Sequence, residues 1–185
     1  MNILKKIKEL FEVDGILVFR DFEGQIFQNN RFEIGYKLVG DIDPTAAIHE
    51  ISHFAELPTE RIIKKPNTNW GFSYGKYWQI GTSWGYEPQT DQATQRELRT
   101  WGYQLSVQRE LGINESAYDL VKSIVWMNDY CIFKHRAGIK EDKDVIAYAA
   151  DIVEKYSNAK FSYKNFLISY KERIEALKNQ PKAVA

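Results

Sequence analysis

The sequence lacks the several cysteines that stabilise small secreted domains and the excess of basic residues that attracts nucleic acid. Its 185 residues include a single cysteine, Cys131, so it can form neither an internal disulfide nor an all-cysteine metal site. Its 25 basic residues are balanced by 25 acidic ones, which argues against a strong general attraction to nucleic acid or to an anionic membrane. No apolar run approaches the length of a transmembrane helix, and the N-terminal residues lack a signal-peptide pattern. These absences predict a cytoplasmic protein.

Hydrophobic patterning predicts one α+β domain spanning residues 1–185, which is long enough to bury a core. The N-terminal twelve residues have an amphipathic pattern, and residues 13–40 read as strands separated by turn signals. The expected strand segments are Ile16–Phe19, Gly24–Phe27 and Phe32–Val39. Four helices are expected to begin near Asp91, Asn114, Glu141 and Ser162. We therefore expect a small N-terminal β-sheet packed on a helical body.

Two of the three histidines flank a glutamate in the motif His49-Glu50-Ile51-Ser52-His53. Residues four apart on a helix share one face at about 6 Å, so both imidazoles can bind one metal ion. Glu50 then follows the first ligand, within reach of a metal-bound water. Shuffling this composition gives the pattern in roughly 0.3% of sequences, so the motif outweighs the alternative of two solvated histidines on a surface helix.

The residues around the motif predict the helix that it requires. Asp43 is a favourable N-cap, Pro44 suits the first helical position, and Pro58 ends the helix after Leu57. Most of the intervening residues are apolar, which predicts a buried helix at the centre of the molecule. Two histidines and a glutamate on such a helix need partners, because unpaired polar groups are costly inside a protein.

A third protein ligand is expected from another segment, and Glu97 is the preferred candidate. It lies four residues before Trp101, on the side of a predicted helix that is expected to be buried. The alternative is that Glu97 forms a salt bridge, for instance with Arg61 or Arg99. Glu56 shares the face of His49, but seven residues of helix rise about 10.5 Å, too far for one ion. His135 lies between two basic residues and is expected to be exposed.

Two histidines and one carboxylate serve two chemistries. With zinc they form a hydrolytic centre in which Glu50 is the general base, whereas with iron(II) they leave adjacent sites for oxygen and substrate. A third interpretation is an interaction module in which the metal only stabilises the fold. The sequence alone does not select the metal.

The segment Ala47–Phe54 resembles the metal-binding segment of the bacterial elongation factor P hydroxylases. Arg61 with the basic residues after it, Asn69–Tyr74 and Thr94–Leu98 extend the resemblance, which covers residues 46–105. The resemblance implies an iron(II) enzyme that hydroxylates a modified lysine on a protein substrate, with a translation factor as the implied partner. Thr94–Leu98 falls where that family supplies its carboxylate ligand, which implies the same role for Glu97.

The chain also departs from that family. It carries extra residues around Lys76–Gly85, and its lysine-rich C-terminal part matches only loosely. A second resemblance, to small zinc metallopeptidases with an HExxH motif followed by a helical glutamate, rests on Glu97, Trp101 and Leu105. It implies zinc in place of iron(II), with Glu50 as the general base.

Glycines and aromatic residues alternate between residues 66 and 88. No phosphate-binding glycine pattern occurs there, and nothing marks a 2-oxoglutarate or nucleotide cofactor. We expect this stretch to form a hairpin or loop that either completes the core or lies over the metal site. Tyr74 is the residue that we expect to make a polar contact near the metal.

Overall fold

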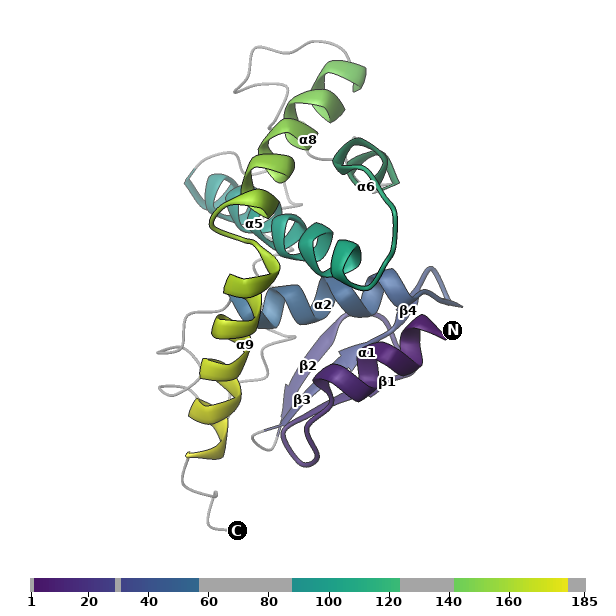
Figure 1. The fold of residues 1–185 in the computed structure, drawn as a ribbon, viewed down its shortest axis with the longest axis vertical. Helices are drawn as coiled ribbons and strands as arrows, with labels where there is room; N and C mark the ends of the chain where they lie inside the picture. Colours follow the sequence, from purple (N-terminus) through teal and green to yellow (C-terminus); the bar gives the residue numbers. More distant parts are fainter. Residues whose placement is uncertain (1, 29–30, 57–87, 124–141, 180–185) are drawn as a thin grey trace. The chain divides into compact units, whose positions relative to one another are not determined.

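The computed structural model describes residues 2–28, 31–56, 88–123 and 142–179. Within these ranges the chain is mixed α+β and mostly helical, with six helices and a small three-stranded sheet (Figure 1). No helix in the described ranges is long and apolar enough to cross a membrane. The chain divides into two compact units, Met1–Gly75 with Lys164–Ala185 and Lys76–Tyr163. The single domain expected from the sequence stays a prediction.

The sheet of the first unit consists of β1 (Leu17–Arg20), β2 (Gln25–Gln28) and β3 (Arg31–Gly35). Its strand order is β1-β3-β2, with β1 parallel and β2 antiparallel to β3. Gly35 ends β3 because its backbone lies against the preceding loop. A side chain there would place its Cβ 2.3 Å from the carbonyl oxygen of Phe22.

The continuous strand expected over Phe32–Val39 is interrupted at Tyr36. The chain then forms a separate two-stranded ladder of β4 (Lys37–Leu38) and β5 (Asp41–Ile42). The backbone N–H of Tyr36 donates to the carbonyl oxygen of Arg20, and the N–H of Lys37 donates to that of Phe22. These bonds hold the chain at the β1–β2 loop, so it turns away from the sheet.

Three helices complete the first unit: α1 (Ile3–Phe11), α2 (Pro44–Glu56) and α9 (Tyr163–Lys178). Its core is rich in aromatic rings packed edge to face. The ring of Phe32 on β3 lies 4.8 Å from that of Phe54 on α2, and Phe54 lies 5.9 Å from Tyr170 on α9. Phe11 on α1 lies 5.6 Å from Tyr170. Edge-to-face rings contribute beyond their buried area, so these contacts hold α1, α2, α9 and the sheet together.

The second unit consists of α5 (Pro88–Glu110), α6 (Ala117–Ser123) and α8 (Asp142–Asn158). Leu98, Trp101 and Leu105 of α5 are each no more than 1% exposed, as their helical spacing predicts. They form one core with buried residues of α6 and α8: Ala117, Leu120, Val121, Ala149, Ala150 and Val153. The helix starts expected near residues 91, 114, 141 and 162 are confirmed to within three residues.

Candidate metal centre

The helix that carries the motif is confirmed, and local contacts explain where it begins. The Asp43 carboxylate accepts hydrogen bonds from the backbone N–H and the hydroxyl of Thr45, both at 2.7 Å. Asp43 therefore caps the first turn, and Pro44 occupies the first helical position as expected. α2 is described as far as Glu56, so the predicted stop at Pro58 lies outside the described residues.

α2 is buried along most of its length. Its core-facing side chains are at most 1% exposed: Ala47, Ile48, Ile51, Phe54 and Ala55. Burying aliphatic and aromatic side chains of this size favours folding by about 1.5–3 kcal/mol each, so the apolar face fixes the helix against the sheet. This packing holds the backbone that carries both histidines.

The two histidines meet on one side of α2. Their Nε2 atoms lie 2.9 Å apart, and their rings are nearly perpendicular with centroids 4.5 Å apart. His53 is buried and only 3% exposed, whereas His49 is half-buried. A hydrogen bond across this contact requires a proton on one nitrogen and a lone pair on the other. A metal ion can take the place of that proton, because it binds the lone pairs of both neutral rings.

The neighbouring motif residues differ in their surroundings. Glu50 is half-buried. Ser52 is fully buried, and its hydroxyl donates back to the carbonyl oxygen of Ile48 at 2.7 Å. Ser52 therefore has a local structural role, which makes it a useful control position.

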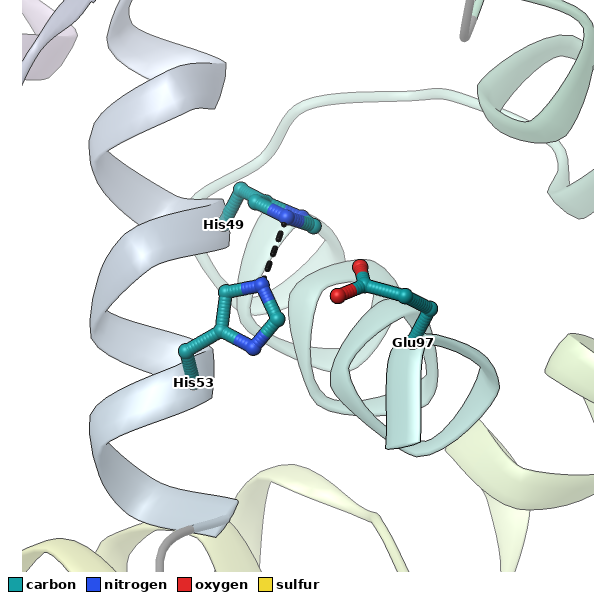
Figure 2. Close-up of side chains that lie close together, drawn as sticks. All are labelled: His49, His53 and Glu97. Atoms are coloured by element: carbon teal, nitrogen blue, oxygen red, sulfur yellow. Dashed lines mark hydrogen bonds between the residues drawn. The ribbon is translucent and has the colours of Figure 1, made fainter. Parts of the chain in front are cut away.

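Glu97 is the third member of the cluster in the structure. One potential ligand atom from each of His49, His53 and Glu97 lies within 4.8 Å of the others, and the Glu97 carboxylate points toward the two rings (Figure 2). Glu97 is at least partly buried. Two imidazole nitrogens and a carboxylate oxygen are the donors that zinc and iron(II) take in proteins, so this set could bind a metal.

The face of α5 that carries Glu97 holds buried polar residues that the sequence analysis missed. Thr100, Gln104 and Gln108 follow Glu97 at intervals of three and four residues and are between 0% and 4% exposed. This spacing places them in line with Glu97. The sequence did contain a signal for them, because they are polar residues at helical spacing from Glu97, next to the apolar stripe that contains Trp101. These three residues and Glu97 therefore form one polar side of α5.

The remaining candidates divide between exposed and undescribed positions. Glu110, nine residues after Trp101 and therefore on the opposite side of α5, is exposed. Tyr74, Arg61, His135 and the glycine-aromatic stretch lie outside the described residues. The polar contact expected from Tyr74 therefore stays a prediction.

Comparison with family models, with curated proteins and with solved structures finds no match to this chain. The resemblance to the elongation factor P hydroxylases rests on the sequence motifs alone.

Proposed function

We propose that the chain is a mononuclear metal-dependent enzyme in which His49, His53 and Glu97 hold one divalent ion. The observation that carries this proposal is the approach of three potential ligand atoms to within 4.8 Å of one another. Two come from successive turns of α2 and the third from α5, so an HExxH motif and a carboxylate from another helix supply the ligand set. In this proposal α2 is the central helix of the enzyme.

Iron(II) is the first choice of metal, and hydroxylation of a protein side chain is the first choice of reaction. Both are supported by the resemblance of Ala47–Phe54 and Thr94–Leu98 to the elongation factor P hydroxylases. The donor set agrees, because two histidines and one carboxylate leave adjacent positions for oxygen and substrate on iron(II). A bound iron(II) would supply the oxygen chemistry, and the protein would position the substrate.

The second candidate is a zinc-dependent peptidase. It is favoured by Glu50, which directly follows the first histidine of an HExxH motif on an observed helix. In that reaction the Glu50 carboxylate accepts a proton from the attacking water and passes it to the leaving amine. Tyr74 is the proposed polar contact near the metal in either reaction.

The experiment that tests the metal site is elemental analysis of protein purified anaerobically without added metal, beside the Glu97→Ala and Ser52→Ala variants. We expect stoichiometric iron in the wild type and in Ser52→Ala, and its loss from Glu97→Ala. Stoichiometric zinc would transfer the proposal to the peptidase. A wild-type protein without any metal would overturn the proposal as a whole.

A second measurement separates an enzyme from a structural metal module. If the metal only stabilises the fold, chelation unfolds the protein, because the energy of metal binding is then energy of folding. An enzyme keeps its helical circular dichroism after chelation and loses oxygen or peptide turnover. Glu50→Gln should bind metal like the wild type and lose turnover, whereas in a structural module it would change nothing measurable.

A further inference from the structure

The hairpin formed by β4 and β5, residues Lys37–Ile42, exposes apolar side chains where water-facing polar ones are usual. Leu38 is 40% exposed, Val39 is 77% exposed and Ile42 is 64% exposed. Three of the seven large exposed hydrophobic residues in the described ranges therefore lie within five consecutive positions. Single exposed apolar residues need no explanation, but a local group of them marks an interaction surface.

The backbone of the hairpin is unfavourable for the residue at its tip. Val39 has a φ of 54°, and the following Gly40 has a φ of 86°. Positive φ at both central residues defines a type I′ turn, which favours Asn-Gly and disfavours β-branched residues. Val39 is the single non-glycine residue with positive φ in the described ranges. Residues held in disfavoured conformations at an exposed position often serve binding.

The hairpin is held firmly despite this unfavourable turn. The backbone N–H of Gly40 donates to the Glu23 carboxylate at 2.6 Å, and Lys37 pairs with Asp21 at 2.7 Å. The N–H of Asp43 donates to the carbonyl oxygen of Tyr36 and closes the base of the ladder. These contacts restrain the apolar tip, which lowers the entropic cost of binding.

The exposed apolar side chains of the hairpin lie on both of its faces. In the ladder Leu38 lies opposite Asp41 and Lys37 lies opposite Ile42, so Leu38 and Ile42 point to opposite faces. An element that exposes an apolar side chain on each face and another at its tip is suited to insertion into a pocket, since a flat surface would cover one face only. The hairpin leads directly into α2 (Figure 1).

The charges of the hairpin and of the β1–β2 loop that holds it limit the kinds of partner that can bind. The hairpin and this loop carry three carboxylates, Asp21, Glu23 and Asp41, and one ammonium group, that of Lys37. The pKa of Lys37 is raised mainly by its hydrogen bond to Asp21 and by the charge of Asp21. Excess negative charge disfavours an anionic membrane or nucleic acid and favours a basic protein surface.

We propose that the hairpin Lys37–Ile42 is a docking element that inserts Leu38, Val39 and Ile42 into an apolar, basic-rimmed pocket of a partner protein. This inference goes beyond the metal site and does not depend on which metal is bound.

One experiment tests the turn. In the full-length chain, Val39→Asn creates the Asn-Gly pair that a type I′ turn prefers, so the melting temperature should rise by about 2–4 °C. Ile42→Asn, on the adjoining strand, should give no such rise. A melting temperature that falls or stays constant in Val39→Asn would show that valine does not cost stability in this turn and would overturn the proposal.

A second experiment tests the partner. p-Benzoylphenylalanine replaces Leu38 in the full-length chain, and photocrosslinking is carried out in cells, with Tyr148, which is 44% exposed, as the control position. The protein crosslinked at position 38 is then purified and titrated against the chain. We expect Ile42→Ser to weaken binding about tenfold or more. Ile168→Ser, at a position 47% exposed on α9, should weaken binding less than about twofold.

The outcomes of these docking experiments can be distinguished from those of the metal-binding experiments. Ile42→Ser should retain the metal content of the wild type, and Glu97→Ala should retain the crosslink at position 38. Binding that weakens as salt rises agrees with the basic rim. The proposal is overturned by equal crosslinks at positions 38 and 148, by a crosslink to lipid or to a second copy of the chain, by no crosslink, or by unchanged binding in Ile42→Ser.

Discussion

The Nε2 atoms of His49 and His53 lie 2.9 Å apart on successive turns of α2. Because α2 is packed along its apolar face, the backbone that carries both rings is held in place. A fixed backbone lowers the cost of ordering the two ligands, so much of the proposed site's metal affinity should reside in these two rings.

His53→Ala should therefore weaken metal binding by more than about 100-fold, since even residues that only support a metal ligand can cost 10–100-fold. The measurement is competition titration of apo-protein with cobalt(II) or zinc(II) against a chromophoric chelator. Ser52→Ala, in the adjacent buried position of the same helix, is the matched control and should bind metal like the wild type. Equal affinities in both variants would exclude His53 as a ligand.

Tyr170 joins α9 to α1 through its phenol, which donates a hydrogen bond to the carbonyl oxygen of Phe11 at 2.6 Å. Tyr170→Phe keeps the aromatic packing and leaves that carbonyl without this donor. We expect the free energy of unfolding to fall by about 1 kcal/mol in urea denaturation at pH 7. Tyr148→Phe, at an exposed position on α8, should change it by less than about 0.5 kcal/mol.

The Tyr170 phenol also makes the stability difference between wild type and Tyr170→Phe depend on pH. Burial raises the pKa of Tyr170 well above its usual value of 10.0. The neutral phenol is favoured in the folded state, so its contribution is complete below about pH 10 and is lost as the pH rises further. Wild type and Tyr170→Phe should therefore approach one another in stability above pH 10. A difference that stays constant to pH 11 would contradict the buried phenol.

Local signals account for what could be predicted from the sequence. Asp43 and Pro44 define where α2 begins, and the four-residue spacing of the histidines places them on one face. Glu97 was inferred from its position relative to Trp101, because a strongly apolar stripe orients its helix. These inferences depend on one helix at a time, which is the scale on which helical periodicity carries information.

The hairpin at Val39 could not be predicted in the same way. The alternating pattern of Phe32–Val39 before Gly40 is typical of a strand, and the turn depends on partners elsewhere in the chain. Asp21 and Glu23 hold the hairpin from the β1–β2 loop, and their pairing cannot be read from local pattern. Thr100, Gln104 and Gln108 were missed for a related reason, since polar residues on a helix are expected to face water.

Arg109 and Glu154 form a two-pronged ion pair between α5 and α8, with N···O distances of 3.0 Å and 2.7 Å. The hydrogen bond from Arg109 is the main cause that lowers the pKa of Glu154 below its usual value of 4.5. The stabilisation is therefore present above pH 4.5 and fades as the pH falls through the lowered value. Both side chains are about two-fifths exposed, at 38% and 41%, which limits the effect through screening.

Glu154→Gln should accordingly reduce the free energy of unfolding by less than about 1 kcal/mol at pH 7 and low salt. The loss should shrink further in 1 M NaCl, where screening is stronger. Urea denaturation of both proteins at pH 7 and pH 3 is the measurement. A loss of equal size at the two pH values would show that the variant disturbs packing and not the ion pair.

Gly102 sets the distance between α5 and the end of α8. A Cβ atom at this position would lie 2.7 Å from the Cβ of Tyr156 and 3.2 Å from the Cβ of Phe161. Neither neighbour can move by rotating its side chain, because both contacts are at the Cβ itself. Gly102→Ala should therefore force the helix and the following loop apart, and the strain outweighs the gain in helix propensity. We expect a net loss of about 1–2 kcal/mol by urea denaturation.

Gly112 provides the contrast, because it is required for its backbone conformation and has open space around it. Its φ is 80°, and the N–H groups of Gly112 and Ile113 donate to the carbonyl oxygens of Arg109 and Gln108 to close the end of α5. Gly112→Ala should cost about 1 kcal/mol, and Gly112→Asn should recover part of this, since asparagine tolerates positive φ. Gly102→Asn should recover nothing, because added volume is what position 102 excludes. A stable Gly102→Asn variant would show that α5 and the segment after α8 do not pack through this glycine.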